Sequence, residues 1–201
     1  AFWSAKQGTL RPAAAPAELG VERKQVYVQM LISAYRFLGN RWAELDPLKR
    51  QPRPPIAELE PTYYDLSEAD LETVFNTGTL VGPERATLRE ILQHLRETYC
   101  GTIGAEYMYI SDPAQKRWIQ QRLESVRGRP QLSPETRRRL LERVTAAETL
   151  EKYLHTRYVG QKRFSLEGGE TIIAMMDELV QRAGAHGVEE LVIGMAPRGR
   201  P

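Results

Sequence analysis

The feature that most constrains the fold is a series of segments whose apolar residues recur every three or four positions, as on one face of an α-helix. Five such segments run over residues 21–38, 84–99, 112–127, 133–158 and 171–183. Asp112-Pro113 and Ser133-Pro134 each place a capping side chain before a proline at the first helical position, which is a typical helix start. The sequence therefore predicts a mainly α protein.

Only one stretch is typical of a buried strand. "ELVIGMA", Glu190 to Ala196, is short, continuous and apolar, and it contains β-branched residues. Because it follows the helical segment at 171–183, it predicts the first helix-strand unit of an α/β domain. The expected layout is a linker at 1–20, a helical domain at 21–160 and the truncated start of the α/β domain at 161–201.

The apolar side of each helical segment predicts which side chains form the core. Gly39 and Asn40 suit the left-handed turn that ends a helix, so the first segment is expected to stop there. The residues expected to point inward are Tyr27, Leu31, Ala34, Tyr35 and Leu38; Leu88, Ile91, Leu92, Leu95 and Tyr99; Leu140, Val144, Ala147, Leu150, Leu154 and Tyr158; and Ile172, Met175, Met176, Leu179 and Val180.

The segments between these helices carry turn and breaker signals. "LDPLKRQPRPP", Leu45 to Pro55, contains four prolines and predicts an extended connector, with a docking site for a proline-reading domain as the alternative. Ser67, followed by Asp70, predicts a short capped helix. Residues 76–84 predict a turn-rich loop. "AEYMYI", at 105–110, is too short to assign to helix or strand.

Composition excludes several classes of protein. The 28 Lys and Arg residues nearly balance 26 Asp and Glu residues, and the formal net charge is only +2. That balance argues against a protein whose main role is to coat nucleic acid. No apolar run approaches the roughly 20 residues that a membrane span needs, and residues 1–20 lack the apolar core of a signal peptide. Cys100 is the only cysteine, which indicates a reducing compartment.

Residue types that could carry chemistry are scattered. His94, His155 and His186 stand singly, so no metal site is expected, and His94 and His155 are predicted to lie at the surface or its boundary. Cys100 is expected to be a buried, inert thiol rather than a nucleophile. Arg137 to Arg139, with Arg143, predict a solvated basic face paired with Glu135 and Glu142; phosphate binding is the alternative.

One loop gathers more charge than the others. "YVGQKRFSLEGGE", Tyr158 to Glu170, places Lys162, Arg163 and Glu167 around a double glycine between two helices. Such a loop can direct backbone N–H groups at an anion where the next helix begins. A flexible hinge with solvated charges is the alternative interpretation.

Several blocks follow one another in a recognisable order: "LISAYRFLGNRWAELDPL", "FNTGTL", "LREILQHLRETYCGTIGAEYMYISD", "RLLERVTAAETLEKYL" and "LHTRYVGQKRFSLEGGETIIAMMDELVQRAGAHGVEELVIGMA". In sequence and spacing they resemble 2-oxoglutarate dehydrogenase, the thiamine-dependent decarboxylating component of its multienzyme complex, and most of all its proteobacterial members. The resemblance covers residues 21–196. It implies an N-terminal fragment in which a helical domain precedes α/β domains that bind thiamine diphosphate and Mg²⁺.

The resemblance also implies an activity and partners. Members of the family are homodimers that decarboxylate 2-oxoglutarate in the tricarboxylic acid cycle and pass the succinyl group to a lipoyl arm of dihydrolipoyl succinyltransferase. A bacterial member is expected in the cytoplasm, without a membrane partner. By the family pattern, Arg163, Glu167 and Arg198 are candidates for positions near the cofactor or substrate.

The chain departs from the family in two respects. The Gly-Asp…Asn motif that holds thiamine diphosphate and Mg²⁺ is absent from these 201 residues, so the chain alone is expected to be inactive. The family sequence "GMAHRGRLNVL" appears here as "GMAPRGRP". Pro197 stands at the position of a family histidine that lines the active centre, so no catalytic residue is intact, and Pro201 replaces a leucine.

"RGRP" itself resembles the core of an AT-hook, which lies in the minor groove of A·T-rich DNA. It occurs at 127–130 and at 198–201. The second copy directly follows an apolar run and coincides with the altered family motif, so DNA binding is not expected. The alternative to the enzyme fragment is a non-catalytic helical interaction module that contacts a partner, or nucleic acid through these segments.

Overall fold

The computed structural model describes residues 20–161 and 166–194. The chain divides into two compact units between Pro130 and Gln131. Most of the described residues are helical, as the sequence predicts. None of the described helices combines the length and the apolar character that crossing a membrane requires.

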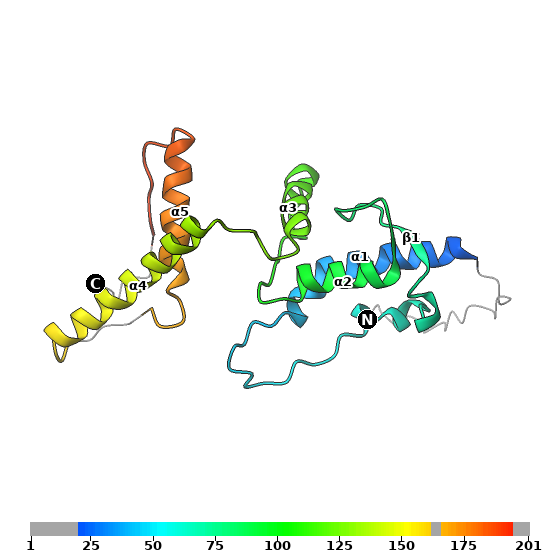
Figure 1. Cartoon of the computed structure of the whole chain (residues 1–201), viewed down its shortest axis with the longest axis horizontal. Coiled ribbons are helices and arrows are strands. Elements are labelled where there is room, and N and C mark those ends of the chain that lie inside the picture. The colour runs from blue at the N-terminus through cyan, green and yellow to red at the C-terminus, as the bar shows by residue number, and fades with distance from the viewer. Residues whose placement is uncertain (1–19, 162–165, 195–201) are drawn as a thin grey trace, which may run out of the picture. The chain divides into compact units, whose positions relative to one another are not determined.

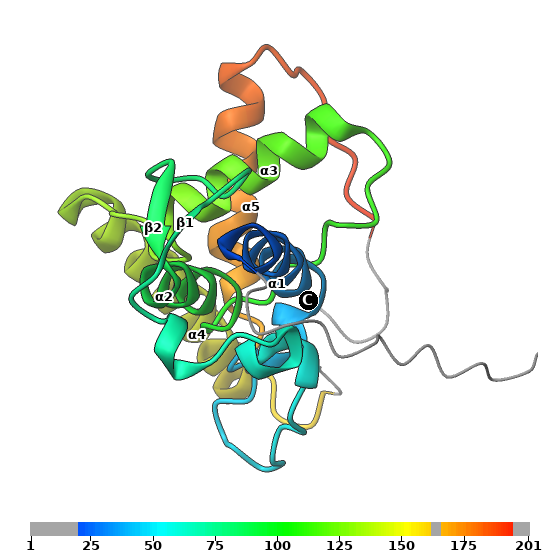
Figure 2. The ribbon, with the colours of Figure 1, turned by 90° about the vertical axis from the view of Figure 1, so that its right-hand side faces the viewer.

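The first unit is built around two helices that lie side by side (Figures 1 and 2). They are α1 (Val21–Trp42) and α2 (Leu88–Tyr99), and α3 (Pro113–Val126) packs against α2. Two short strands, β1 (Val74–Asn76) and β2 (Arg85–Thr87), pair antiparallel, with Phe75 opposite Ala86. Three single 3₁₀ turns lie between α1 and β1: η1 (Ala57–Leu59), η2 (Pro61–Tyr64) and η3 (Glu68–Asp70).

Helix α1 does not stop at Gly39 and Asn40, as the sequence analysis expected, but continues to Trp42. Gly39 is buried, and a Cβ atom placed on it would lie 2.6 Å from the Cβ of Tyr99 on α2. The glycine is therefore needed for the close approach of two helices and not for a left-handed turn. A single sequence cannot distinguish these two uses of glycine.

Helix α2 begins at Leu88, four residues later than the periodicity predicts. Residues 85–87 instead form strand β2, and Thr87 caps the helix. The carboxylate of Glu90 accepts hydrogen bonds from the Thr87 backbone N–H and hydroxyl, both at 2.8 Å, while Glu90 N–H donates to the Thr87 hydroxyl. This is a capping box, and it fixes the start of the helix where the apolar pattern alone does not.

The core of the first unit confirms the predicted helix faces. All five residues predicted on α2 are buried. On α1, Leu31 and Tyr35 are buried, and the other three predicted residues are half-buried against the core. The short capped helix after Ser67 and the loop between the strands also form as predicted. Residues 43–56 contain no helix or strand, as the prolines there require.

The second unit is a pair of helices, α4 (Pro134–Arg157) and α5 (Thr171–Ala185). The predicted start of α4 is confirmed, since the Ser133 hydroxyl accepts a hydrogen bond from Thr136 N–H at 3.2 Å. Arg139 and Arg143 both pair with Asp177 of α5, at 2.7 and 3.3 Å. The expectation that Glu135 and Glu142 would pair with this basic face is wrong, because an acidic side chain on the neighbouring helix lies within reach.

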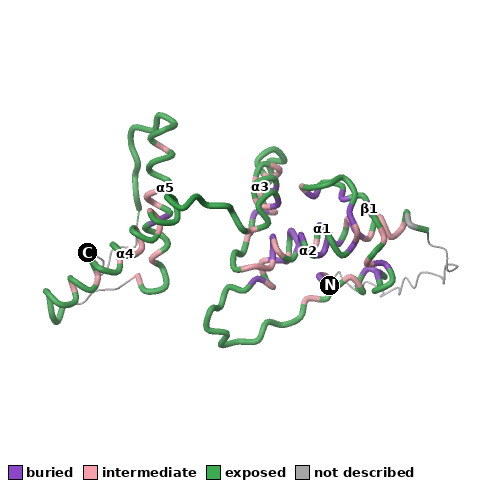
Figure 3. The backbone as a smooth tube through the Cα atoms, viewed as in Figure 1, coloured by how far each residue is buried: buried purple, intermediate pink, exposed green. Residues whose placement is uncertain are grey.

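The apolar faces predicted for α4 and α5 are largely exposed within this unit (Figure 3). No residue of α4 is buried, and in α5 only Ala174 is. Exposed members of the predicted faces are Leu150, Tyr158, Ile172, Met175, Leu179 and Val180. The prediction of Met175 as a core residue is therefore wrong for this chain. Two helices bury only the narrow strip between them, so the remaining apolar surface has no neighbour among the described residues of this unit.

The predicted strand at 190–196 is not formed by residues 190–194, the part that the structure describes. Val192 is 96% exposed. A β-strand needs a neighbouring strand to satisfy its backbone groups, and the described residues of this unit offer none. The division at Pro130 does not show which residues would belong to an α/β domain. The predicted domain limits therefore stay predictions.

Candidate functional site

Most of the site residues named from the sequence lie outside the described residues. These are Arg163, Pro197 and Arg198. Glu167 is described: it is exposed and lies in the turn that leads into α5. Its proposed place near a cofactor therefore stays a prediction.

The loop before α5 directs two backbone N–H groups at carboxylates of the chain itself. Gly168, at a positive φ of 82°, donates its N–H to Glu170 at 3.2 Å. Leu166 donates its N–H to Glu151 of α4 at 2.5 Å. These two N–H groups are therefore engaged by carboxylates of the chain itself, and the anion site predicted for this loop stays a prediction.

A buried ion pair that the sequence analysis did not identify lies in the first unit. Arg36 of α1 and Glu124 of α3 are 6% and 1% exposed. The guanidinium binds the carboxylate through two bonds, Nε to Oε1 at 2.8 Å and Nη2 to Oε2 at 3.2 Å. Burial acts to lower the pKa of Arg36, but the hydrogen bond to Glu124 and the negative charge of its carboxylate together outweigh burial and raise that pKa. Arg36 therefore keeps its positive charge in the folded protein.

The carboxylate of Glu124 has further donors on both oxygens. Tyr99 donates its hydroxyl to Oε1 at 2.7 Å, and Val81 donates its backbone N–H to Oε2 at 2.9 Å. Tyr107 shares a hydrogen bond of 2.8 Å with the Tyr99 hydroxyl. Burial, together with the neighbouring negative charge of Glu124, raises the pKa of Tyr99, which keeps its proton.

Arg36 also ties the loop between the strands to this cluster. Its guanidinium donates to the Thr79 hydroxyl at 2.8 Å and to the Thr79 carbonyl at 3.0 Å. One network therefore fixes α1, α2, α3 and the inter-strand loop relative to one another. The sequence contains a weak indication that Arg36 is buried. It lies three residues before Gly39 and four after Ile32, and this spacing places it on the side of α1 that packs against α2.

His94 is buried, and the prediction that it would lie at the surface is wrong. It is 5% exposed on α2, and its Nε2 lies 3.0 Å from the main-chain oxygen of Glu124. A carbonyl oxygen only accepts, so Nε2 carries the proton when the ring is neutral. Burial lowers the pKa of His94, and the hydrogen bond to Glu124 opposes this only in part. His155, in contrast, is exposed as predicted.

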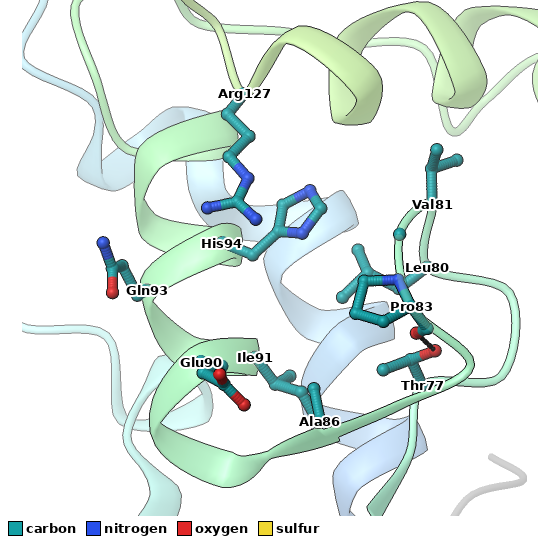
Figure 4. A pocket seen from close by; sticks show the side chains of 11 residues that line it. Thr77, Leu80, Val81, Pro83, Ala86, Glu90, Ile91, Gln93, His94 and Arg127 are labelled. Atoms are coloured by element: carbon teal, nitrogen blue, oxygen red, sulfur yellow. Dashed lines mark hydrogen bonds between the residues drawn. The ribbon is translucent and has the colours of Figure 1, made fainter.

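A pocket of about 220 Å³ lies beside His94 (Figure 4). Apolar side chains from the inter-strand loop, β2 and α2 form much of its wall, and Arg127 lies at one end. The lining residues are Thr77, Leu80, Val81, Gly82, Pro83, Ala86, Glu90, Ile91, Gln93, His94 and Arg127.

The remaining candidates show little sign of reactivity. Burial raises the pKa of Cys100 to about 11, so its thiol is protonated and a poor nucleophile, which supports the predicted inert role. Among residues 20–161 and 166–194, no group of three or more His, Cys, Asp or Glu side chains is placed to hold a metal ion.

Comparison with known proteins decides the family. A 2-oxoglutarate dehydrogenase E1 component of Cupriavidus necator is 59% identical over 197 residues, which is 98% of this chain. The chain belongs to the 2-oxoglutarate dehydrogenase E1 family. Proteins of the same name from Azotobacter vinelandii and Coxiella burnetii are 57% and 43% identical, over 89% and 92% of the chain. No family profile matches the sequence.

The resemblance seen in the sequence motifs is thereby confirmed. The chain spans only about one fifth of the length of these relatives: 21%, 19% and 20% respectively. Four fifths of each related E1 component thus have no counterpart in the 201 residues.

Proposed function

We propose that the chain is the N-terminal part of a 2-oxoglutarate dehydrogenase E1 component. The complete protein would decarboxylate 2-oxoglutarate and transfer the succinyl group to a lipoyl arm. The observation that carries this proposal is the 59% identity to an E1 component across 98% of the chain. The order of the sequence blocks, which follows that of the family, agrees with it.

The residues of this chain do not fit a complete site for thiamine diphosphate and Mg²⁺. The described residues contain no carboxylate cluster for the metal ion, and the 201 residues lack the Gly-Asp…Asn motif. The Gly168 N–H, which could bind a diphosphate oxygen, donates to Glu170 instead. The cofactor would therefore be held by residues outside this sequence, and the chain would contribute Arg163, Glu167 and Arg198 to its surroundings.

The first unit would contribute a firmly packed support to the complete protein. The network around Arg36 and Glu124 fixes three helices and a loop by buried and part-buried hydrogen bonds. Such a unit is suited to support a neighbouring catalytic domain without taking part in the reaction. Dimerisation, binding of dihydrolipoyl succinyltransferase and location in the bacterial cytoplasm belong to the same proposal.

The alternative, a helical module that binds nucleic acid through its RGRP segments, is less well supported. Arg127 begins the first copy, and it ends helix α3 in a left-handed conformation with φ 48°. Its guanidinium pairs with Glu97 at 3.3 Å and lines the pocket beside His94. An AT-hook needs an extended basic segment, whereas this arginine is engaged by a folded unit.

The proposal is tested with a chimaera. Residues 1–201, carrying Pro197→His, are joined to the remaining domains of the Cupriavidus necator relative. We expect ferricyanide reduction that depends on 2-oxoglutarate, thiamine diphosphate and Mg²⁺, while the 201-residue chain alone gives none. A folded chimaera without activity, next to an active parent enzyme, would contradict the proposal.

A further inference from the structure

The pocket beside His94 is lined by a ring nitrogen of that buried residue, and this nitrogen has no protein partner among the described residues. Nε2 of His94 donates to the carbonyl of Glu124, so the lone pair of the neutral ring lies on Nδ1. Among the described residues no donor bonds Nδ1. A Cβ atom built on Gly82, which lines the pocket, would lie 3.8 Å from Nδ1 and 3.7 Å from Cε1. This edge of the ring therefore faces the pocket, and a ligand there would meet an acceptor.

Arg127 provides a positive charge next to this acceptor. Figure 4 shows its guanidinium beside the His94 ring, with Glu90 at the other end of the pocket. The ion pair of Arg127 with Glu97 is long, at 3.3 Å, and the arginine side chain is 47% exposed. Such a pair contributes little to stability, and it leaves most guanidinium N–H groups available to a second carboxylate.

Glu90 does not compete with Nδ1 of His94 for the N–H or O–H donor of a ligand. Its carboxylate is held by the Thr87 N–H and hydroxyl in the capping box, which lowers the pKa of Glu90. Leu80, Pro83 and Ile91 give the wall an apolar part, and Thr77 and Gln93 add polar side chains to it. A cavity of about 150 Å³ already binds benzene, so about 220 Å³ accommodates a small ring with a carboxyl group.

We propose that this pocket binds a small carboxylate that carries an N–H or O–H donor beside its carboxyl group. The carboxylate pairs with Arg127, the donor bonds Nδ1 of His94, and the apolar body lies against Leu80, Pro83 and Ile91. 2-Oxoglutarate has no such donor, so this pocket is a site separate from that of the proposed enzymatic substrate.

The test uses two probes that differ in one group. Pyrrole-2-carboxylate has an N–H beside its carboxyl group, and furan-2-carboxylate has an oxygen acceptor in its place. Both are titrated into the 201-residue chain at pH 7.5 and followed by ¹H–¹⁵N NMR. We expect pyrrole-2-carboxylate to shift the amides of Val81, Gly82 and Gln93 saturably. Furan-2-carboxylate and 2-oxoglutarate should bind about tenfold more weakly or not at all, because each leaves Nδ1 unpaired.

Matched variants locate the two contacts. Arg127→Asn removes the charge and keeps a residue that tolerates a positive φ; it should weaken binding about tenfold. Arg129→Asn removes the same charge two residues away, from an exposed side chain outside the pocket, and should leave affinity within about twofold. His94→Phe keeps an aromatic ring of similar size but has no acceptor, so the two ring probes should bind equally.

Three results would overturn the inference. One is the absence of saturable binding of pyrrole-2-carboxylate to the folded chain. Another is equal affinity for pyrrole- and furan-2-carboxylate in the unsubstituted protein, a comparison that needs no variant to fold. The third is an equal loss of affinity in Arg127→Asn and Arg129→Asn, which would mean a diffuse charge effect. None of these results bears on the chimaera, so failure here is distinct from failure of the proposed enzymatic role.

Discussion

A Glu124→Gln substitution would leave the guanidinium of Arg36 buried without its counter-charge. In the folded protein Glu124 accepts two hydrogen bonds from Arg36, one from Tyr99 and one from Val81 N–H. Breaking one side of a buried ion pair costs about 3–5 kcal/mol. Glutamine keeps one oxygen acceptor but turns an NH₂ group towards donors. We therefore expect the free energy of unfolding to fall by about 3 kcal/mol.

Urea unfolding followed by circular dichroism at 222 nm measures this loss. With a urea dependence of about 1–3 kcal/mol per molar, the midpoint should fall by at least about 1 M. The matched control is Glu72→Gln, which removes an equally short ion pair, 2.7 Å from Arg89, between side chains that are 60% and 73% exposed. That change should cost less than about 1 kcal/mol.

A second substitution separates the charge from the packing. Arg36→Met in the Glu124→Gln background removes the unpaired cation. We expect the double variant to be more stable than the sum of the two single losses predicts, with a coupling energy above about 1 kcal/mol. If Glu124→Gln costs no more than Glu72→Gln, the assignment of the network as the structural centre of the first unit is wrong.

Three further predictions use other parts of the structure. Gly39→Ala should lower the free energy of unfolding by about 1–3 kcal/mol, because the new Cβ has no room against α2. Gly184→Ala, in a helix with open space around it, should raise the free energy of unfolding by up to about 1 kcal/mol in the same urea assay. If Gly39→Ala stabilised the protein and Gly184→Ala destabilised it, the close approach at Gly39 would be refuted. The folded-state pKa of His94 is depressed, so its contribution to stability should be present above the unfolded pKa of about 6.5 and be lost as pH falls below it. His94→Gln should remove this part of the pH dependence, measured as urea midpoints from pH 8 to pH 5, whereas substitution of the exposed His155 by glutamine should leave it unchanged. If His94→Gln and the unsubstituted protein gave the same dependence of the urea midpoint on pH, the prediction would be contradicted. In the chimaera, Pro197 should give a kcat about 10²–10³-fold below that of Pro197→His, because proline offers no donor to developing charge, and equal kcat values would show that this position has no chemical role.

The candidate site illustrates the limits of sequence reasoning. Arg163 and Glu167 were singled out by the charge of the loop around the double glycine, but only the family pattern places them, with Arg198, near a cofactor or substrate. His94 was assigned to the surface because a lone histidine on a helix is usually found there. What places it inside is the carbonyl of Glu124 on another helix, and no local pattern encodes that contact. The pocket likewise needs three separate segments to form its walls.

The sequence by itself determined the helices, their start signals at Asp112 and Ser133, and the buried face of α2, because caps and apolar periodicity act over a few neighbouring residues. It also determined the family, through blocks in a fixed order. Only the tertiary structure decided that Gly39 lies inside a helix and that Arg36 and Glu124 form a buried pair, 88 positions apart. It also decided that residues 190–194 form no strand. Each of these depends on a partner distant in the sequence: a facing helix, a counter-charge or a neighbouring strand.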